Sequence, residues 1–328
     1  MTAVVEASGL SRSFKVPERD AGVRSAVKGL FRRSTRTSHA VRDLDLRVEP
    51  GEVVGFLGAN GAGKTTTLKL LSGLLHPSSG SVRVLGHEPA RREPAYLRRM
   101  ALVMGNRHQL QWDLPAVDSF ELNRAIYRIP WPEFRRARDE LVELLDLGDL
   151  VRKPVRNLSL GERMKMELAG SLLHRPEVLF LDEPTLGLDV TMQRRVRSFL
   201  ADYNRAHSAT VLLTSHYMAD IEALCRRVVV IHHGKVLFDG ALSRLGEQFA
   251  AYREIEVTPD DPGADLGAYG ECRPAGEGRA RIRVPAADVP ATMARLLADV
   301  GITDLTVTAP PIEDVIARIF TSGAAVPS

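Results

Sequence analysis

The fold of this chain is decided by the stretch Val53-Val54-Gly55-Phe56-Leu57-Gly58-Ala59-Asn60-Gly61-Ala62-Gly63-Lys64-Thr65-Thr66. It begins as a short apolar run, which is typical of a buried strand in a parallel sheet. It then breaks into a glycine-rich turn and continues as an amphipathic helix. Gly58, Gly63, Lys64 and Thr65 fill the G-x-x-x-x-G-K-[ST] spacing of a phosphate-binding loop.

The glycines of such a loop let the backbone curl until several N–H groups face one anion, and the helix start adds its positive end. Lys64 is expected to reach the β- and γ-phosphates, and the Thr65 hydroxyl is expected to bind Mg²⁺. The remaining loop positions expected at the nucleotide are Asn60, Gly61, Ala62, Gly63 and Thr66. The alternative is a strand–helix turn that carries a lysine by chance. The strand–loop–helix context favours a nucleoside triphosphate site, with ATP and Mg²⁺ as the expected ligands.

Length and composition limit the remaining possibilities. The 328 residues suffice for one large domain and a small one, and contents of 44% hydrophobic and 26% charged residues are ordinary for a globular protein. A net charge of +3 is too small to indicate nucleic-acid binding by itself. Cys225 and Cys272 have no metal or redox spacing. Because no apolar run approaches the ~18 residues of a spanning helix, we expect a cytosolic protein.

Apolar strands alternate with helical segments along most of the chain, which predicts an α/β fold with a parallel sheet covered on both faces. This domain is expected over residues 1–245. Within it, residues from about 90 to 175 are richer in arginine and helical in pattern, and they contain Trp112 and Trp131. We therefore expect a helical subdomain there.

Two further segments stand apart from this pattern. Residues 17–39 are basic and begin with a proline, Pro17, and they are either a basic amphipathic helix in part or a solvated surface insertion. Residues 252–328 read as a small α+β domain, with strands at 254–258, 279–284 and 302–308 and helices at 290–300 and 312–320. A glycine- and proline-rich loop is expected at 259–278.

A second chemical motif is the apolar strand Val178–Leu181, which ends in Asp182 and Glu183. At the carboxyl edge of a parallel sheet, beside a phosphate loop, Asp182 can hold Mg²⁺. Glu183 is then placed to orient and deprotonate an attacking water. An acidic turn alone would be a weak signal, but after a phosphate loop it predicts hydrolysis.

A third motif, Leu158-Ser159-Leu160-Gly161-Glu162, introduces a helix. Ser159 and Glu162 form an S-x-x-E capping box, which is a sufficient structural explanation. The functional alternative is that this helix start, with its serine hydroxyl and Gly161, grips a γ-phosphate.

In their order, these motifs resemble those of ABC transporter ATPases. The phosphate loop is followed by Leu-Ser-x-Gly-Glu, Asp-Glu-Pro-Thr at 182–185, Gly187-Leu188-Asp189 and Thr214-Ser215-His216. The resemblance covers about residues 4–240. It implies a P-loop ABC ATPase core with a helical subdomain, to which a small C-terminal α+β domain is added.

The resemblance also implies roles for individual residues. Phe14 matches the aromatic residue that stacks on adenine, although a core phenylalanine is the alternative. Ser159 and Gly161 match the signature that closes on ATP held by a second protomer, so a homodimer is expected, and Glu162 is expected at the nucleotide with them. Asp189 matches the dimer-loop aspartate. His216 matches the switch histidine that contacts the γ-phosphate.

The sequence departs from the family pattern in two places. The signature has Leu160 and Glu162 where the family favours glycine and glutamine. Asn106 stands where the family has a γ-phosphate-sensing glutamine, and Gln109 is the nearby alternative. Asparagine carries the same amide on a side chain one methylene shorter, which puts direct metal ligation there in doubt.

Within the family, the stretch Gln109-Leu110-Gln111-Trp112-Asp113-Leu114-Pro115 and the small C-terminal domain resemble ATPase subunits of ABC-2-type exporters, among them drug and viologen exporters. This resemblance implies an ATP-hydrolysing motor subunit of such an exporter. Its expected partners are separate transmembrane permease subunits, possibly two different chains, at the cytoplasmic face of the plasma membrane. The alternative is a soluble ABC-type ATPase that acts on the ribosome or DNA. Only one phosphate loop occurs, and the interval 64–158 is too short for a long coiled-coil insertion. A non-hydrolysing regulatory subunit is disfavoured by the presence of both Glu183 and His216.

Overall fold

The computed structural model describes residues 3–17, 35–105, 109–249, 252–261, 263–276, 278–310 and 314–316. The chain divides into two compact units, Met1–Asp239 and Gly240–Ser328, and each is described here by itself.

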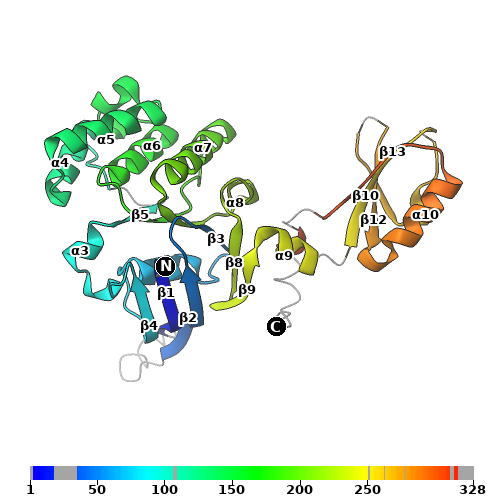
Figure 1. The fold of residues 1–328 in the computed structure, drawn as a ribbon, viewed down its shortest axis with the longest axis horizontal. Helices are drawn as coiled ribbons and strands as arrows, with labels where there is room; N and C mark the ends of the chain where they lie inside the picture. The colour runs from blue at the N-terminus through cyan, green and yellow to red at the C-terminus, as the bar shows by residue number, and fades with distance from the viewer. Residues whose placement is uncertain are drawn as a thin grey trace, which may run out of the picture. The chain divides into compact units, whose positions relative to one another are not determined.

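The first unit is built on a six-stranded sheet of order β5-β6-β7-β3-β8-β9 (Figure 1). The strands are β5 Met100–Met104, β6 Val178–Asp182, β7 Thr210–Thr214, β3 Val53–Leu57, β8 Arg227–His232 and β9 Lys235–Ala241. Neighbouring strands from β5 to β8 run parallel. Strands β6 and β7 are buried along their whole length, which explains why they read as continuous apolar runs.

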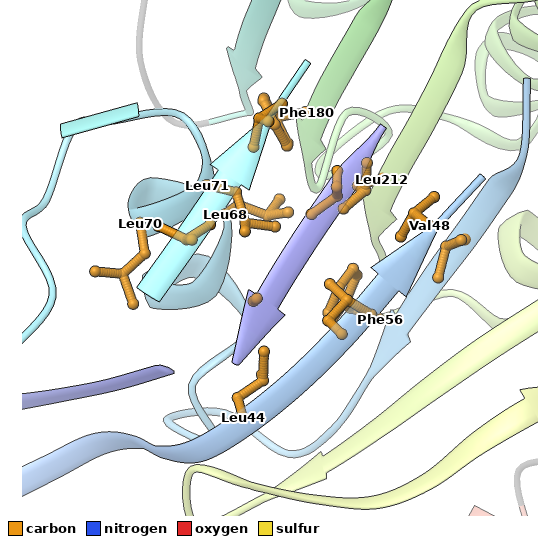
Figure 2. Close-up of a cluster of buried hydrophobic side chains, with 14 of the residues drawn as sticks. Leu44, Val48, Phe56, Leu68, Leu70, Leu71, Phe180 and Leu212 are labelled. Atoms are coloured by element: carbon orange, nitrogen blue, oxygen red, sulfur yellow. The ribbon is translucent and has the colours of Figure 1, made fainter. Parts of the chain in front are cut away.

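The first unit also contains a three-stranded antiparallel sheet of order β2-β1-β4. Its strands are β1 Val5–Pro17, β2 Thr35–Val48 and β4 Ser79–Val84. Helix α2, Lys64–Leu71, contacts strands of both sheets. Figure 2 shows the apolar side chains of this core, with Leu44, Val48, Phe56, Leu68, Leu70, Leu71, Phe180 and Leu212 labelled. Because α2 is held by this core, the loop that precedes it has a fixed position.

The helices of the first unit lie between and beside these strands. They are α3 Pro94–Leu97, α4 Ala116–Tyr127, α5 Trp131–Leu144, α6 Leu160–Leu172, α7 Val190–His207 and α8 Met218–Leu224. Helices α4 and α5 both contact α6, and α6 also contacts β5. The segment of about 90–175 is therefore not purely helical, because it also supplies β5 to the large sheet.

The ends of the basic segment expected at 17–39 belong to strands, with Pro17 in β1 and Thr35 in β2. Residues 18–34 lie outside the described part of the chain. Residues 35–39 are not part of an insertion, because they form the start of β2 and pair with β1, for example Thr37 with Lys15. The strand thus begins before the alternating apolar pattern at Leu44, since backbone pairing with β1 does not require apolar side chains.

The second unit begins with α9, Leu242–Phe249, and contains an antiparallel sheet of order β11-β12-β10-β13. Its strands are β10 Tyr252–Pro259, β11 Glu271–Pro274, β12 Ala280–Pro285 and β13 Ile302–Thr308. Helix α10, Val289–Asp299, contributes Leu296 to a core with Ile255, Val257, Ile282 and Val284. Strand β11 lies within the predicted loop 259–278. The helix predicted at 312–320 lies outside the described residues except for 314–316.

Candidate functional site

The phosphate loop folds around the side-chain ammonium of Lys64. Its Nζ donates hydrogen bonds to the carbonyls of Gly58, at 2.6 Å, and Ala59, at 3.2 Å. Gly63 has φ +117°, and a Cβ there would lie 2.3 Å from the Ala40 carbonyl oxygen. No side chain fits this position, which accounts for the second glycine of the motif. The loop thus keeps its backbone close to the lysine that starts α2.

Lys64 is only 5% exposed as a residue. Burial lowers the pKa of Lys64, and the negative charges of Glu183 and Asp182 oppose this shift. Loop residues and Glu183 line a small hollow of about 140 Å³. A buried cation beside a ring of backbone N–H groups fits a phosphate chain.

Asp182 connects the phosphate loop to the large sheet. Its Oδ1 accepts hydrogen bonds from the hydroxyls of Thr65, at 2.9 Å, and Thr214, at 2.8 Å. Thr65 and Asp182, the two residues predicted to bind Mg²⁺, therefore meet directly. Among the described residues, no group of three or more His, Cys, Asp or Glu side chains could hold a metal ion. A Mg²⁺ ion here would need phosphate and water oxygens as its other ligands, as is usual for this ion.

Glu183 and His216 also come together. Nε2 of His216 lies 2.7 Å from Oε1 of Glu183, a hydrogen-bond distance. The backbone of Glu183 has φ +55°, a left-handed conformation that is unusual for a non-glycine residue. The N–H of Glu183 donates to the Thr214 carbonyl at 3.1 Å, which fixes the turn to the end of β7. Such unusual backbone conformations occur preferentially at functional sites.

Gly105 directly follows β5 and lies beside Asp182 and Glu183 at the same edge of the sheet. Its N–H donates to the Asp182 carbonyl at 2.9 Å, and a Cβ on it would lie 2.4 Å from the Glu183 carbonyl oxygen. A larger residue at 105 would displace the backbone that carries both carboxylates.

The signature residues form the predicted cap of α6. The Ser159 N–H donates to the Glu162 carboxylate at 2.8 Å, and the Glu162 N–H donates to the Ser159 hydroxyl at 3.3 Å. These bonds hold the pKa of the Glu162 carboxyl below its ordinary value. Gly161 faces α7, because a Cβ on it would lie 2.9 Å from Cγ of Met192. Asp189 caps α7 by accepting from the Met192 N–H at 2.9 Å.

The described part of the chain has no hydrogen bond from Ser159 or Asp189 to the phosphate loop. The structure therefore brings together Lys64, Thr65, Asp182, Glu183 and His216, while the signature forms a separate cluster with the start of α7.

Two predicted site residues need separate comment. Phe14 is half-buried in β1 and lies outside the buried core cluster, and the Arg12 guanidinium carbon is 4.7 Å from its ring centroid. Asn106 lies outside the described residues. Gln109 is described, and its Nε2 donates to the Leu102 carbonyl at 2.6 Å.

Sequence reasoning missed two buried carboxylates near the site, Glu167 and Asp220. The Glu167 carboxylate accepts the backbone N–H groups of Gln109 and Leu110 at 3.0–3.4 Å, and it is only 3% exposed. Burial raises the pKa of Glu167. The available signal was an acidic residue on the otherwise apolar face of α6, between Met164 and Leu168.

Comparison with known proteins agrees with this geometry. The ABC transporter family model matches residues 41–186, and the model of the C-terminal domain of EvrA-like ABC transporters matches residues 251–308. Among the described residues, no helix is long and apolar enough to span a membrane.

Several relatives are ATP-binding proteins. The chain is 35% identical to the ABC transporter ATP-binding protein NatA of Bacillus subtilis, over 66% of this chain and 88% of that protein. It is 39% identical to the daunorubicin resistance ATP-binding protein DrrA3 of Streptomyces coeruleorubidus, over 70% and 71%. It is 33% identical to the bacitracin transport ATP-binding protein BcrA of Bacillus licheniformis, over 67% and 70%.

Solved structures give the same result for the fold. An ATP-binding subunit of an ABC transporter matches with a TM-score of 0.61 and 25% identity, over 75% of this chain and 93% of that chain. A dimeric ATP-binding cassette bound to ADP and Pi matches with a TM-score of 0.60 and 21% identity, over 73% and 98%. With its phosphate loop, adjoining carboxylates and helix-capping signature, the chain belongs to the family of ABC transporter ATP-binding proteins.

Proposed function

We propose that this chain is the ATP-hydrolysing subunit of a membrane exporter of the ABC-2 type. The observation that carries the proposal is the meeting of Thr65, Asp182, Glu183 and His216 at one sheet edge, beside the buried Lys64. The relatives support transport as the purpose of hydrolysis, because their names describe drug resistance, bacitracin transport and Nod factor export.

Each residue of this edge has a distinct task in hydrolysis. Lys64 and the loop N–H groups neutralise the phosphate charge as it develops. Thr65 and Asp182 would hold Mg²⁺, which supplies further positive charge at the β- and γ-phosphates. Glu183 accepts the proton of the attacking water, and His216, whose Nε2 lies 2.7 Å from the Glu183 carboxylate, would contact the γ-phosphate.

A second copy of the chain is needed to complete the site. Ser159, Gly161 and Asp189 lie on a helix start and a neighbouring turn, with no hydrogen bond to the phosphate loop of their own chain within the described residues. In the proposed homodimer, each signature covers the ATP bound by the other protomer. The N-terminus of a helix such as α6 suits a phosphate, because its backbone N–H groups and its positive dipole end point toward the anion.

The helical region is the proposed contact with separate permease subunits. Trp112 and Trp131 are about half exposed, and the Arg163 and Arg124 guanidinium groups lie over their rings. A hollow of about 530 Å³ is lined by Tyr127 at the end of α4, Glu133 in α5 and Leu173 after α6, and neither tryptophan lines it. Exposed aromatic side chains are typical anchors for a partner segment. This contact would place the chain at the cytoplasmic face of the plasma membrane.

The test uses the full chain with the multi-helix membrane proteins encoded beside its gene. Reconstituted together in vesicles, they are expected to co-purify with the chain and to stimulate its ATPase activity. Stimulation by ribosomes or DNA, and none by any membrane protein, would contradict the export function and support the soluble alternative.

A further inference from the structure

We propose that Asp220 is a positioning residue for ATP hydrolysis. It holds the turn that carries Glu183 and the segment that carries His216 in a fixed position relative to α7. The inference rests on the proposed function, because it assigns a support to the same catalytic pair.

Asp220 lies on α8 and is 1% exposed. Its Oδ2 accepts the hydroxyl of Thr185 at 2.5 Å and the hydroxyl of Ser215 at 2.6 Å. Its Oδ1 accepts Nη1 of Arg197 at 2.7 Å. One buried carboxylate therefore receives three side-chain donors from three different segments.

Each of these donors is adjacent to a part of the site. Thr185 lies two residues after Glu183, in the turn that follows β6. Ser215 directly precedes His216, and its hydroxyl also accepts the Tyr217 N–H at 3.0 Å. Arg197 belongs to α7, the helix that Asp189 caps and that packs against α8. The Asp220 carboxylate is thus the common partner of three segments: the turn that carries Glu183, the segment that carries His216, and helix α7.

The burial of Asp220 favours a rigid arrangement of the three segments that it joins. A carboxylate buried to this extent is tolerated only when its charge and lone pairs are satisfied, and losing one partner of a buried ion pair is costly. Hydrogen bonds in such low-dielectric surroundings are stronger and more directional in effect than at the surface. The φ of +55° at Glu183 also needs support from its surroundings to persist. Asp220 gives that support through Thr185.

A purely structural role for Asp220 makes a different prediction. A buried ion pair that only stabilises the fold would change the melting temperature, while turnover per folded molecule would stay the same. A positioning role changes kcat while the KM for ATP and the fold are kept, because the hydrogen-bonding side chains found on Asp220 among the described residues, Thr185, Ser215 and Arg197, lie outside the phosphate loop.

The experiment removes the two hydroxyl donors and leaves Asp220 and Arg197 intact. Thr185→Val, Ser215→Ala and the double variant are compared with Thr210→Val. Thr210 is a buried threonine at the opposite end of β7, whose hydroxyl accepts the Gly51 N–H at 2.9 Å. For each full-length variant, kcat and KM for MgATP and the melting temperature are measured.

We expect each site variant to lower kcat about tenfold, a part of the ~10²–10⁴-fold contribution of a positioned base, with KM within about twofold of wild type. The double variant is expected to lose less than the product of the single losses, because both hydroxyls serve one carboxylate. Thr210→Val is expected to keep kcat. Unchanged kcat in the site variants, or a loss matched by Thr210→Val at equal melting temperature, would overturn the proposal.

Glu183→Gln in the same preparation separates this result from the proposed function. If Glu183→Gln abolishes turnover while Thr185→Val and Ser215→Ala leave it unchanged, the hydrolytic function stands and only the role of Asp220 is lost. If Glu183→Gln also retains turnover, the proposed function itself fails.

Discussion

Individual charged residues of this chain are buried where the nucleotide edge of the sheet lies. Lys64, Asp182, Glu167 and Asp220 are each less than a tenth exposed. Lys64 donates to carbonyls of its own loop, and the three carboxylates accept hydrogen bonds from other segments. Burying a charge is costly unless it is paired, so each of these side chains must keep its hydrogen-bond partners in place. They keep the phosphate loop, the carboxylates and the switch segment in one arrangement.

The first prediction at this scale concerns the sensing residue. Because the Gln109 amide already donates to the Leu102 carbonyl, we expect Asn106 to be the group that responds to the γ-phosphate. Asn106→Ala should keep ATP binding but weaken the stimulation of ATPase by the permease, and Gln109→Ala should do less. A water bridge can replace a direct contact of the shorter amide, so basal turnover need not fall. Partner-stimulated ATPase is the measurement, and a larger loss for Gln109→Ala would contradict the assignment to Asn106.

A second prediction concerns His174 and acid. Burial lowers the pKa of His174 from 6.5 to about 4, while its Nε2 contacts the Met100 carbonyl at 3.0 Å and its ring stacks on Tyr127. Between these two values the unfolded chain binds the proton and the folded chain does not. The free energy of unfolding should therefore fall as the pH drops from about 6.5 toward 4, by about 1.4 kcal/mol per pH unit for this group.

Urea unfolding at pH 7.5, 6 and 5 tests this dependence. His174→Gln should reduce the loss of stability with falling pH, whereas His76→Gln, at an exposed histidine, should leave it unchanged. An equal pH dependence in wild type and His174→Gln would show that other groups cause the acid sensitivity.

At the scale of elements, the sequence predicted most of the large sheet and the local fold of the site. Strands β6 and β7 are buried on both faces, so they appear in the sequence as continuous apolar runs at 178–181 and 210–214, which can be recognised without tertiary information. The capping box of Ser159 and Glu162 was predictable because it depends only on residues three apart.

Other elements could not be read from local pattern. Strand β5 lies among helical segments, and only its pairing with β6 decides its conformation. Strand β11 is exposed along its length and the first residues of β2 are polar, so neither has an apolar face to reveal it. The hydrogen bonds of Asp220 and Glu167 join segments up to 58 residues apart, which no spacing rule can detect.

The third prediction concerns α6 and the segment that starts at Gln109. Glu167→Ala leaves the part-buried backbone N–H of Gln109 and the buried N–H of Leu110 without their acceptor, which should destabilise the chain by about 1–3 kcal/mol. Glu167→Gln should cost less, because one side-chain oxygen still accepts. Glu143→Ala, at an exposed position of α5, is the control in urea unfolding. Equal stability of Glu167→Ala and Glu143→Ala would show that this carboxylate does not hold the segment.

At the scale of the whole molecule, the two units have separate cores. The phosphate chemistry lies entirely in the first unit, and the second has its own apolar cluster around Ile255 and Leu296. We propose that the second unit regulates or stabilises the dimer without touching ATP.

The fourth prediction follows from this separation. A chain that ends at residue 249 should bind ATP with unchanged affinity. The described residues that line the hollow at the phosphate loop all belong to the first unit. Its assembly or its basal ATPase should change. Nucleotide titration and analytical ultracentrifugation measure the two properties. Loss of ATP binding in the shortened chain would show that the units are not separable.

The central claim is that two copies of the chain enclose ATP and hydrolyse it with Glu183 as the base. Its most direct test is MgATP turnover and ATP-dependent dimerisation of wild type and Glu183→Gln, measured on the same full-length preparations. Glu183→Gln should bind ATP, remain dimeric with it, and turn over at least ~100-fold more slowly than wild type, as expected for the loss of a general base. Near-normal turnover by Glu183→Gln, or an ATP-bound chain that stays monomeric, would contradict the account.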